Sequence, residues 1–183
     1  MKYKLIAVDM DGTLLNSQGV ITEKTRDAIR RISARGAIFT VCTGRPIQGV
    51  EIYKDALIMD NPFITYNGAM IVMGDTKQIL YEQGIASADA REIVAFAKSF
   101  GTTVTVWSEN KLYVNQLNDR TRAYQKLSQV EPILITDEEA VIARGITKIL
   151  WIDEIDQIGS YQQILRHQLS RGVTFCTSKP NFL

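Results

Sequence analysis

Two carboxylates stand two positions apart near the start of the chain, at the end of a short apolar run. Asp9 and Asp11 follow residues 5–8, which predict a buried strand, and Gly12 and Thr13 come directly after them. Charged side chains leave water at a high cost unless a metal ion or hydrogen-bond donors pair with them. A Mg²⁺ ion held by Asp9 and Asp11 would supply that pairing. The pattern therefore predicts a reaction site rather than part of a hydrophobic core.

The chemistry that fits these residues is phosphoryl transfer through an aspartate. Asp9 is the expected nucleophile, because a carboxylate can form an acyl phosphate that water then hydrolyses. Asp11 can protonate the leaving oxygen and later activate the water. Gly12 lets the backbone bend and turn its N–H groups towards an anion. The alternative is a strand-to-turn junction in which both aspartates only accept hydrogen bonds from the backbone.

A second polar string follows a second apolar run. Residues 37–42 predict a strand, and Thr43, Gly44 and Arg45 come directly after it. A threonine hydroxyl and a glycine N–H at a strand end can hold a phosphate oxygen. An ordinary strand exit is the alternative for this string, and a structural ion pair is the alternative for Arg45.

The segment between the two runs predicts a helix over residues 22–35. Thr22 is its expected N-cap, Ile29 lies on its apolar stripe, and Gly36 is its expected stop. A strand, a helix and a second strand form a right-handed crossover with the two strands parallel. Both polar strings should therefore lie at the carboxyl ends of adjacent strands, where open α/β sheets bind ligands.

These strings resemble the motifs of the haloacid dehalogenase-like hydrolases, specifically the Cof-type branch of sugar-phosphate and related phosphatases. Residues 9–15 are similar to the first family motif, residues 43–45 to the second, and residues 64–69 to a string typical of the branch. The resemblance implies a Mg²⁺-dependent phosphatase of small phosphorylated metabolites with an aspartyl-phosphate intermediate.

The resemblance also implies a role for each site residue. Asp9 would be the nucleophile and a Mg²⁺ ligand, and Asp11 would be the acid and base and bind Mg²⁺ through its backbone carbonyl. Thr43 and the Gly44 amide would hold the phosphate. Asn67 would lie near the substrate entrance, and a hairpin turn at Asn67 and Gly68 is its alternative.

Two further family motifs are not found after Thr43. One is a lysine that pairs with the phosphate, and the other is a Gly-Asp loop whose acids complete the Mg²⁺ site. Gly74 and Asp75 lie in an expected hairpin turn, and Lys179 does not stand in the family's lysine motif. We therefore expect a C-terminally truncated chain. Without the residues of these two motifs, the charge that develops in the transition state has too few partners. This favours a second hypothesis for this chain alone, a truncated non-catalytic homologue or fragment.

The expected fold is α/β, with a Rossmann-like parallel-sheet core over residues 1–82, incomplete at its C-terminal part, and an inserted α+β cap over residues 83–183. Further core elements are expected at residues 46–58 (helix), 62–66 (strand) and 69–81 (hairpin). Cap helices are expected at residues 86–100, 120–127 and 155–170, with strands at 102–108, 112–115, 147–152 and 173–177.

Composition and charge argue against several classes of protein. The net charge of +1 gives no reason to expect binding to nucleic acid or to a membrane surface, and no apolar run is long enough to span a membrane. Cys42 and Cys176 do not suggest a disulfide framework, so we expect a cytoplasmic protein. Strand 3–8 would be an exposed apolar edge of a truncated chain, which predicts a homo-oligomer paired across it.

Three other residues of chemically versatile types are expected to be structural. His167 is the sole histidine of the sequence and lies on a polar helix face between Arg166 and Gln168. Trp107 and Trp151 lie in expected strands, where packing in the core is the simpler role.

Overall fold

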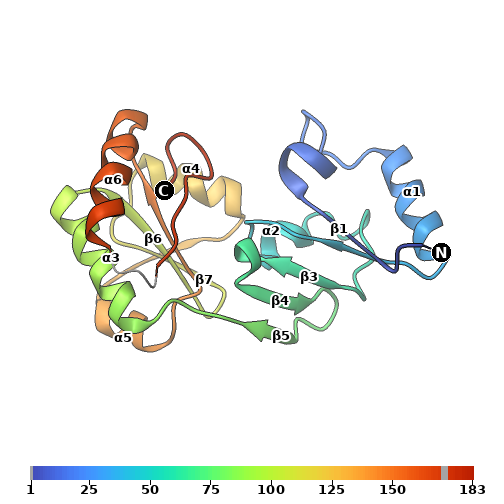
Figure 1. Ribbon diagram of the computed structural model, residues 1–183, viewed down its shortest axis with the longest axis horizontal. Helices are drawn as coiled ribbons and strands as arrows, with labels where there is room; N and C mark the ends of the chain where they lie inside the picture. The colour runs from blue at the N-terminus through green and yellow to red at the C-terminus, as the bar shows by residue number, and fades with distance from the viewer. Residues whose placement is uncertain (1, 170–172) are drawn as a thin grey trace. The chain divides into compact units, whose positions relative to one another are not determined.

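The computed structural model describes residues 2–169 and 173–183 of the chain. These residues fall into two compact units, Met1–Gln83 and Gly84–Leu183 (Figure 1). Each unit combines helices with strands, which confirms the α/β fold class. Among the described residues, no helix has both the length and the apolar character needed to cross a membrane.

The first unit is built on strands that begin as a parallel pair. Its elements are β1 (Leu5–Val8), α1 (Glu23–Ser33), β2 (Ile38–Val41), α2 (Ile47–Glu51), β3 (Pro62–Thr65), β4 (Met70–Met73) and β5 (Ile79–Glu82). β1 and β2 are parallel, with Val8 opposite Val41. A parallel bridge between Cys42 and Ile64 joins β3 to β2, and β3, β4 and β5 form an antiparallel meander. The strands β1, β2 and β3 therefore end at the same edge.

Helix α1 connects the parallel pair and has the expected ends. The Thr22 hydroxyl accepts a hydrogen bond from the Thr25 N–H at 3.3 Å, which confirms Thr22 as the N-cap. Ile29 is buried. Gly36 follows the helix with a φ of 84°, a conformation that glycine adopts without steric cost.

The helix expected over residues 46–58 is wrong in length, because α2 ends at Glu51. Beyond that residue the backbone bonds join residues three apart, from Tyr53 to Val50 and from Lys54 to Glu51. Such bonds form a tighter turn than an α-helix. Gly49, in the middle of α2, lowers the helix propensity of the segment.

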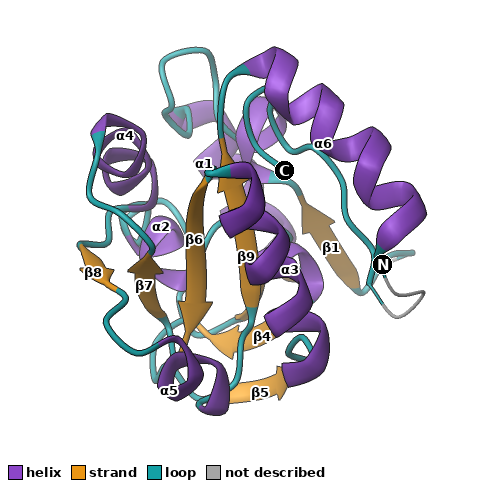
Figure 2. Cartoon of the chain, turned by 90° about the vertical axis from the view of Figure 1, so that its left-hand side faces the viewer, coloured by secondary structure: helices purple, strands orange, loops and turns teal. Residues whose placement is uncertain are grey.

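The second unit is a mixed sheet with helices on both faces, as Figure 2 shows. Its elements are α3 (Ser87–Phe100), β6 (Thr103–Ser108), β7 (Lys111–Val114), α4 (Asp119–Ser128), β8 (Pro132–Leu134), α5 (Glu138–Ala143), β9 (Lys148–Ile152) and α6 (Ile155–Gln168). The strands lie in the order β8-β7-β6-β9. β8 was not expected from the sequence, and the expected last turn of α6 at residue 170 lies outside the described residues.

Strand β6 lies at the centre of this unit and is buried on both faces. Val104 and Val106 belong to the apolar cluster formed with α3 and α6, whereas the Trp107 ring packs edge-on against Tyr124 of α4. Every residue of β6 is therefore buried. Trp107 and Trp151 are buried, as expected, and His167 is exposed.

The strand expected at residues 173–177 is also wrong, because that segment has no regular secondary structure. The chain instead adds its last residues to the edge of β9. The Trp151 N–H donates to the Leu183 carbonyl at 2.7 Å, and the Leu183 N–H donates to the Trp151 carbonyl at 3.0 Å. A paired edge strand satisfies backbone groups that would otherwise be left open.

Candidate active site

A wide turn after β1 carries the two aspartates. It spans Met10–Leu14 and is closed by the Leu14 N–H, which donates to the Asp9 carbonyl at 3.1 Å. Met10 and Leu14 are buried and anchor the turn, whereas Asp9 and Asp11 are exposed. Gly12 has a φ of 78°, so the sharp bend expected at this glycine is present. The apolar anchors therefore hold both carboxylates in solvent.

The backbone brings the second string to the same edge of the sheet. The Cys42 N–H donates to the Val8 carbonyl at 2.9 Å, and the next residue, Thr43, donates to the Ile64 carbonyl at 2.9 Å. Thr43 is only 3% exposed. Its position directly after β2 places it at the end of the strand beside β1, which is the arrangement that the strand, helix and strand order predicted.

Arg45 forms a two-pronged ion pair with Asp11. The arginine Nε donates to Oδ2 of Asp11 at 2.8 Å, and Nη2 donates to Oδ1 at 2.6 Å. The hydrogen bond to Asp11 is the main cause that raises the pKa of Arg45, against the opposing effect of burial. Of the alternatives for Arg45, the ion pair is the one present in the structure.

Two supports of Arg45 were missed by sequence analysis. Nη1 of Arg45 donates to the Gly49 carbonyl at 3.2 Å, and the guanidinium carbon lies 5.6 Å from the centre of the Tyr53 ring. A cation over an aromatic face is attracted by the ring quadrupole. Arg45, Gly49 and Tyr53 are each four positions apart, and this spacing is the signal that could have grouped them on one face.

Gly44 and Asn67 lie side by side. Asn67 has a φ of 59°, and its N–H donates to the Thr43 carbonyl at 3.0 Å. A Cβ at Gly44 would lie 2.5 Å from Oδ1 of Asn67, so only glycine fits there without a shift. Asn67 and Gly68 connect β3 to β4, which confirms the hairpin turn. Contact between Asn67 and a substrate stays a prediction.

The carboxylates of the turn differ in their availability to a metal ion. Among the described residues, the Asp9 carboxylate forms no ion pair or hydrogen bond, whereas both oxygens of Asp11 bond Arg45. The same described residues contain no group of three or more histidine, cysteine or acidic side chains suited to a metal. Mg²⁺ is often held by one or two protein oxygens together with water and phosphate, so the residues present fit such an ion.

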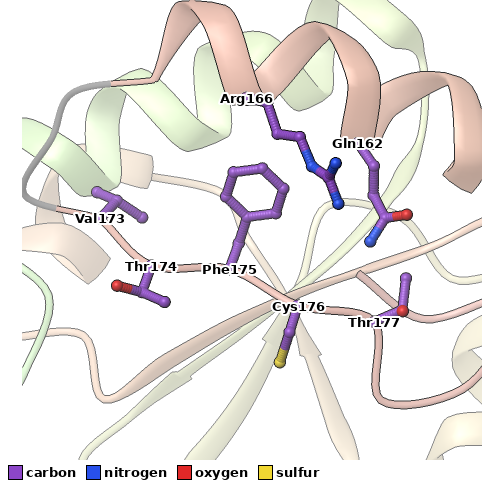
Figure 3. A pocket seen from close by; sticks show the side chains of 7 residues that line it. All are labelled: Gln162, Arg166, Val173, Thr174, Phe175, Cys176 and Thr177. Carbon is purple, nitrogen blue, oxygen red and sulfur yellow. The ribbon is translucent and has the colours of Figure 1, made fainter.

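A cavity of about 470 Å³ in the second unit has a different composition. Its lining comes from α6 and residues 173–177, and consists of Gln162, Arg166, Val173, Thr174, Phe175, Cys176 and Thr177 (Figure 3). Figure 3 shows the Cys176 sulfur pointing away from Arg166 and Gln162. None of the expected site residues lines this cavity, and no carboxylate does, so we do not assign it to the chemistry of Asp9.

Comparisons with known proteins show the family to which the chain is similar. The sequence profile of the haloacid dehalogenase-like hydrolases matches residues 6–183. A Bacillus subtilis protein named "Putative phosphatase YxeH" is 30% identical over 185 residues, which are 98% of this chain and 68% of that protein. The 5-amino-6-(5-phospho-D-ribitylamino)uracil phosphatase YwtE of the same organism is 39% identical over 92 residues, 50% of this chain and 31% of its own length.

Solved structures show the same fold. A haloacid dehalogenase-like hydrolase from Bacteroides thetaiotaomicron superposes with a TM-score of 0.86 at 22% identity, over 99% of this chain and 70% of that chain. The chain therefore has the fold of these hydrolases and spans about 70% of the length of that solved protein.

Proposed function

Because the chain belongs to the haloacid dehalogenase-like hydrolases, of the Cof type, we propose that it is a phosphatase of small phosphorylated metabolites that works through an aspartyl phosphate. The observation that carries this proposal is the exposed turn of Met10–Leu14, which presents the Asp9 carboxylate beside the end of β2. A carboxylate held in solvent by buried neighbours is available to react, whereas a capping aspartate would be bonded to the backbone.

In the first step, an oxygen of Asp9 attacks the phosphorus of the substrate. The bond from phosphorus to the leaving oxygen breaks, and that oxygen takes a proton from Asp11. In the second step, Asp11 removes a proton from water, and the water oxygen attacks the same phosphorus. The bond to Asp9 then breaks, which releases inorganic phosphate and restores the Asp9 carboxylate and the protonated Asp11 side chain.

Thr43 and Gly44 are proposed to hold the phosphate during these steps. The Thr43 hydroxyl oxygen accepts a hydrogen bond from the Arg45 N–H at 3.2 Å, which leaves its own O–H to donate to an anion. Gly44 has no side chain between its backbone and Asn67, so the loop approaches an anion closely. Asn67, on the neighbouring turn, is proposed to contact the substrate.

The proposed cofactor is Mg²⁺, held by the Asp9 carboxylate and the Asp11 backbone carbonyl. When bound, the ion would offset the charge of the phosphoryl oxygens. The hydrogen-bond donors of Thr43 and Gly44, already in place before the reaction, would stabilise the same charge. Removal of one such donor typically lowers the rate by about 10²–10³-fold.

The substrate class follows from the relatives rather than from the site. YwtE is named for a phosphorylated ribityl compound, and we propose a phosphorylated metabolite of similar size for this chain. We further propose that the first unit, expected over residues 1–82 and found as Met1–Gln83, is the core, and that the second unit, expected over residues 83–183 and found as Gly84–Leu183, is a cap that sets specificity. A cytoplasmic location is proposed on the basis of the free cysteines Cys42 and Cys176.

A second candidate is binding of a phosphorylated metabolite without turnover. It is supported by the two bonds between Arg45 and Asp11, which occupy both oxygens of the proposed acid and base. A third acid that could hold a metal is also absent among residues 2–169 and 173–183.

We also propose self-association through β1. Within the described residues β1 pairs only with β2, and Leu5 and Ile38, opposite one another in the register, are 57% and 47% exposed. An open apolar edge is a template for pairing with another chain.

Hydrolysis of p-nitrophenyl phosphate tests the proposed activity. We expect turnover with Mg²⁺, loss of turnover with a chelator, and a fall of at least about 10³-fold in Asp9→Asn. Asp60→Asn, at another exposed aspartate of the first unit, is the matched control and should retain activity. Turnover that survives Asp9→Asn would refute the aspartyl-phosphate route, and binding of phosphate without any turnover would favour the second candidate.

A further inference from the structure

The Arg45 side chain is held on several sides. Its Nε and Nη2 atoms bond Asp11, its Nη1 atom bonds the Gly49 carbonyl, and the Tyr53 ring lies under the guanidinium. The side chain is 15% exposed, whereas that of Asp11 is 58% exposed. The arginine is therefore the fixed member of the pair.

The Arg45 backbone is fixed as well. Its N–H donates to the Thr43 hydroxyl at 3.2 Å, and its carbonyl accepts a bond from the Tyr66 N–H at 3.1 Å. Hydrogen bonds therefore hold both the N–H and the carbonyl of Arg45, one within the loop that follows β2 and one to the turn that follows β3. A guanidinium with a fixed plane can set the plane of the carboxylate that it grips, because its donors form a rigid fork.

The loop that carries Asp11 is tied to this segment at a second point. The Tyr53 hydroxyl donates to the Gly19 carbonyl at 3.1 Å. Gly19 lies eight positions after Asp11, within the same connection between β1 and α1. The segment from Arg45 to Tyr53 therefore contacts that connection at both of these places.

We propose that Arg45 is a positioning residue that acts on the reaction through Asp11 and does not hold the phosphate. This inference rests on the proposed function. Three of the guanidinium donors already have acceptors inside the first unit, and two of these bonds fix the carboxylate of the proposed acid and base. Groups that orient a reacting side chain from behind typically change activity by about 10–100-fold.

The kinetic test compares Arg45→Gln with Arg45→Lys. We expect kcat to fall by about 10–100-fold in both, because lysine cannot form the two-pronged bond, while KM stays within about twofold. In an Asp11→Asn background, Arg45→Gln should cause no further loss, since the two residues act as one unit. Arg30→Gln is the matched control, because Arg30 forms an exposed pair with Asp27 on α1 and should leave both constants unchanged.

A spectroscopic test does not need turnover. The Nε–H resonance of Arg45, observed by nuclear magnetic resonance, should move in Asp11→Asn and stay in place when inorganic phosphate is added to the wild-type chain. A resonance that moves with phosphate but not with Asp11→Asn would overturn the inference. A large rise in KM with unchanged kcat in Arg45→Gln would overturn it too. An inactive wild-type chain would refute the proposed function, and the resonance would still decide whether Arg45 holds Asp11.

Discussion

The two units place a carboxylate beside an arginine in different ways. In the first unit the Asp11 side chain is 58% exposed beside Arg45, whereas in the second the Asp153 side chain is 9% exposed beside Arg120. Asp153 also accepts a hydrogen bond from the Tyr161 hydroxyl at 3.0 Å. A buried charge is costly to disturb once its partners are in place, while an exposed one can exchange protons with a ligand. The comparison supports the chemistry that we propose for Asp11 in the first unit and a structural role for Asp153 in the second.

Matched substitutions of the two aspartates should separate these roles most strongly. We expect Asp11→Asn to lower turnover of p-nitrophenyl phosphate by about 10²–10⁴-fold, because the amide cannot act as acid or base. Asp153→Asn should leave turnover of the folded protein close to that of the wild type. Steady-state kinetics on both variants measures this, and an equal loss of kcat in the two would remove the distinction between the units.

The second unit should lose stability at high pH. Burial raises the pKa of Tyr124 to about 12, although the hydrogen bond from Trp107 opposes this effect. Below pH 10 the tyrosine is neutral in both states, and between about pH 10 and 12 only the unfolded state ionises, so stability falls as pH rises. The loss approaches about 2–3 kcal/mol for a shift of two units.

Urea unfolding followed by tryptophan fluorescence reports on this unit, because Trp107 and Trp151 both belong to it. In Tyr124→Phe the slope between pH 10 and 12 should flatten, with a loss of about 1 kcal/mol at neutral pH from the missing hydrogen bond. An unchanged slope in this variant would assign the alkaline loss to another group.

Replacement of Arg45 or Arg120 should reveal a smaller difference between the two units, this time in the free energy of unfolding. We expect Arg120→Gln to cost about 1–2 kcal/mol, because the buried Asp153 carboxylate loses an ion-pair partner. The cost is not larger because Arg120 is one-third exposed, so solvent already screens the ion pair. Arg45→Gln should cost less than about 1 kcal/mol, since Asp11 is solvated without it. Hydrogen exchange resolved by segment measures each unit separately, and a larger loss in the first unit would contradict the comparison.

The smallest effect on folding is expected at the β1 edge. Leu5→Lys should change the free energy of unfolding by less than about 0.5 kcal/mol, because Leu5 is exposed. The same change should abolish self-association, since charges on an edge strand oppose pairing. Light scattering across a concentration series measures this. A wild-type chain that stays monomeric throughout would refute the proposed interface.

Local signals predicted several elements of both units well. Thr22 and Gly36 marked the ends of α1, and α3 ends at Phe100 as expected, where Gly101 follows with a φ of 67°. A local cap also starts α5, because the Asp137 side chain accepts a bond from the Ala140 N–H. These features depend on hydrogen bonds within one turn of the chain, so the sequence of that turn is sufficient to predict them.

Features that depend on distant partners were less predictable. The last residues of the chain pair with β9 at Trp151, and β8 adds a short strand that begins at Pro132. Both depend on the edges of a sheet that is assembled elsewhere in the sequence. In the candidate site, by contrast, the order of elements did predict that Asp9 and Thr43 follow neighbouring strands. Which acceptor Arg45 would bond could not be predicted, because Asp11 lies 34 positions away.

The most direct measurement is to trap the covalent intermediate on Asp9. The protein is mixed with a phosphate ester and Mg²⁺, quenched in acid and treated with borohydride, which reduces an aspartyl phosphate to homoserine. Peptide mass spectrometry should then find homoserine at position 9 in the wild-type chain and in the active control Asp60→Asn, and no such product in Asp9→Asn. Turnover without modification at position 9, or modification at another carboxylate, would contradict the central claim that Asp9 is the nucleophile.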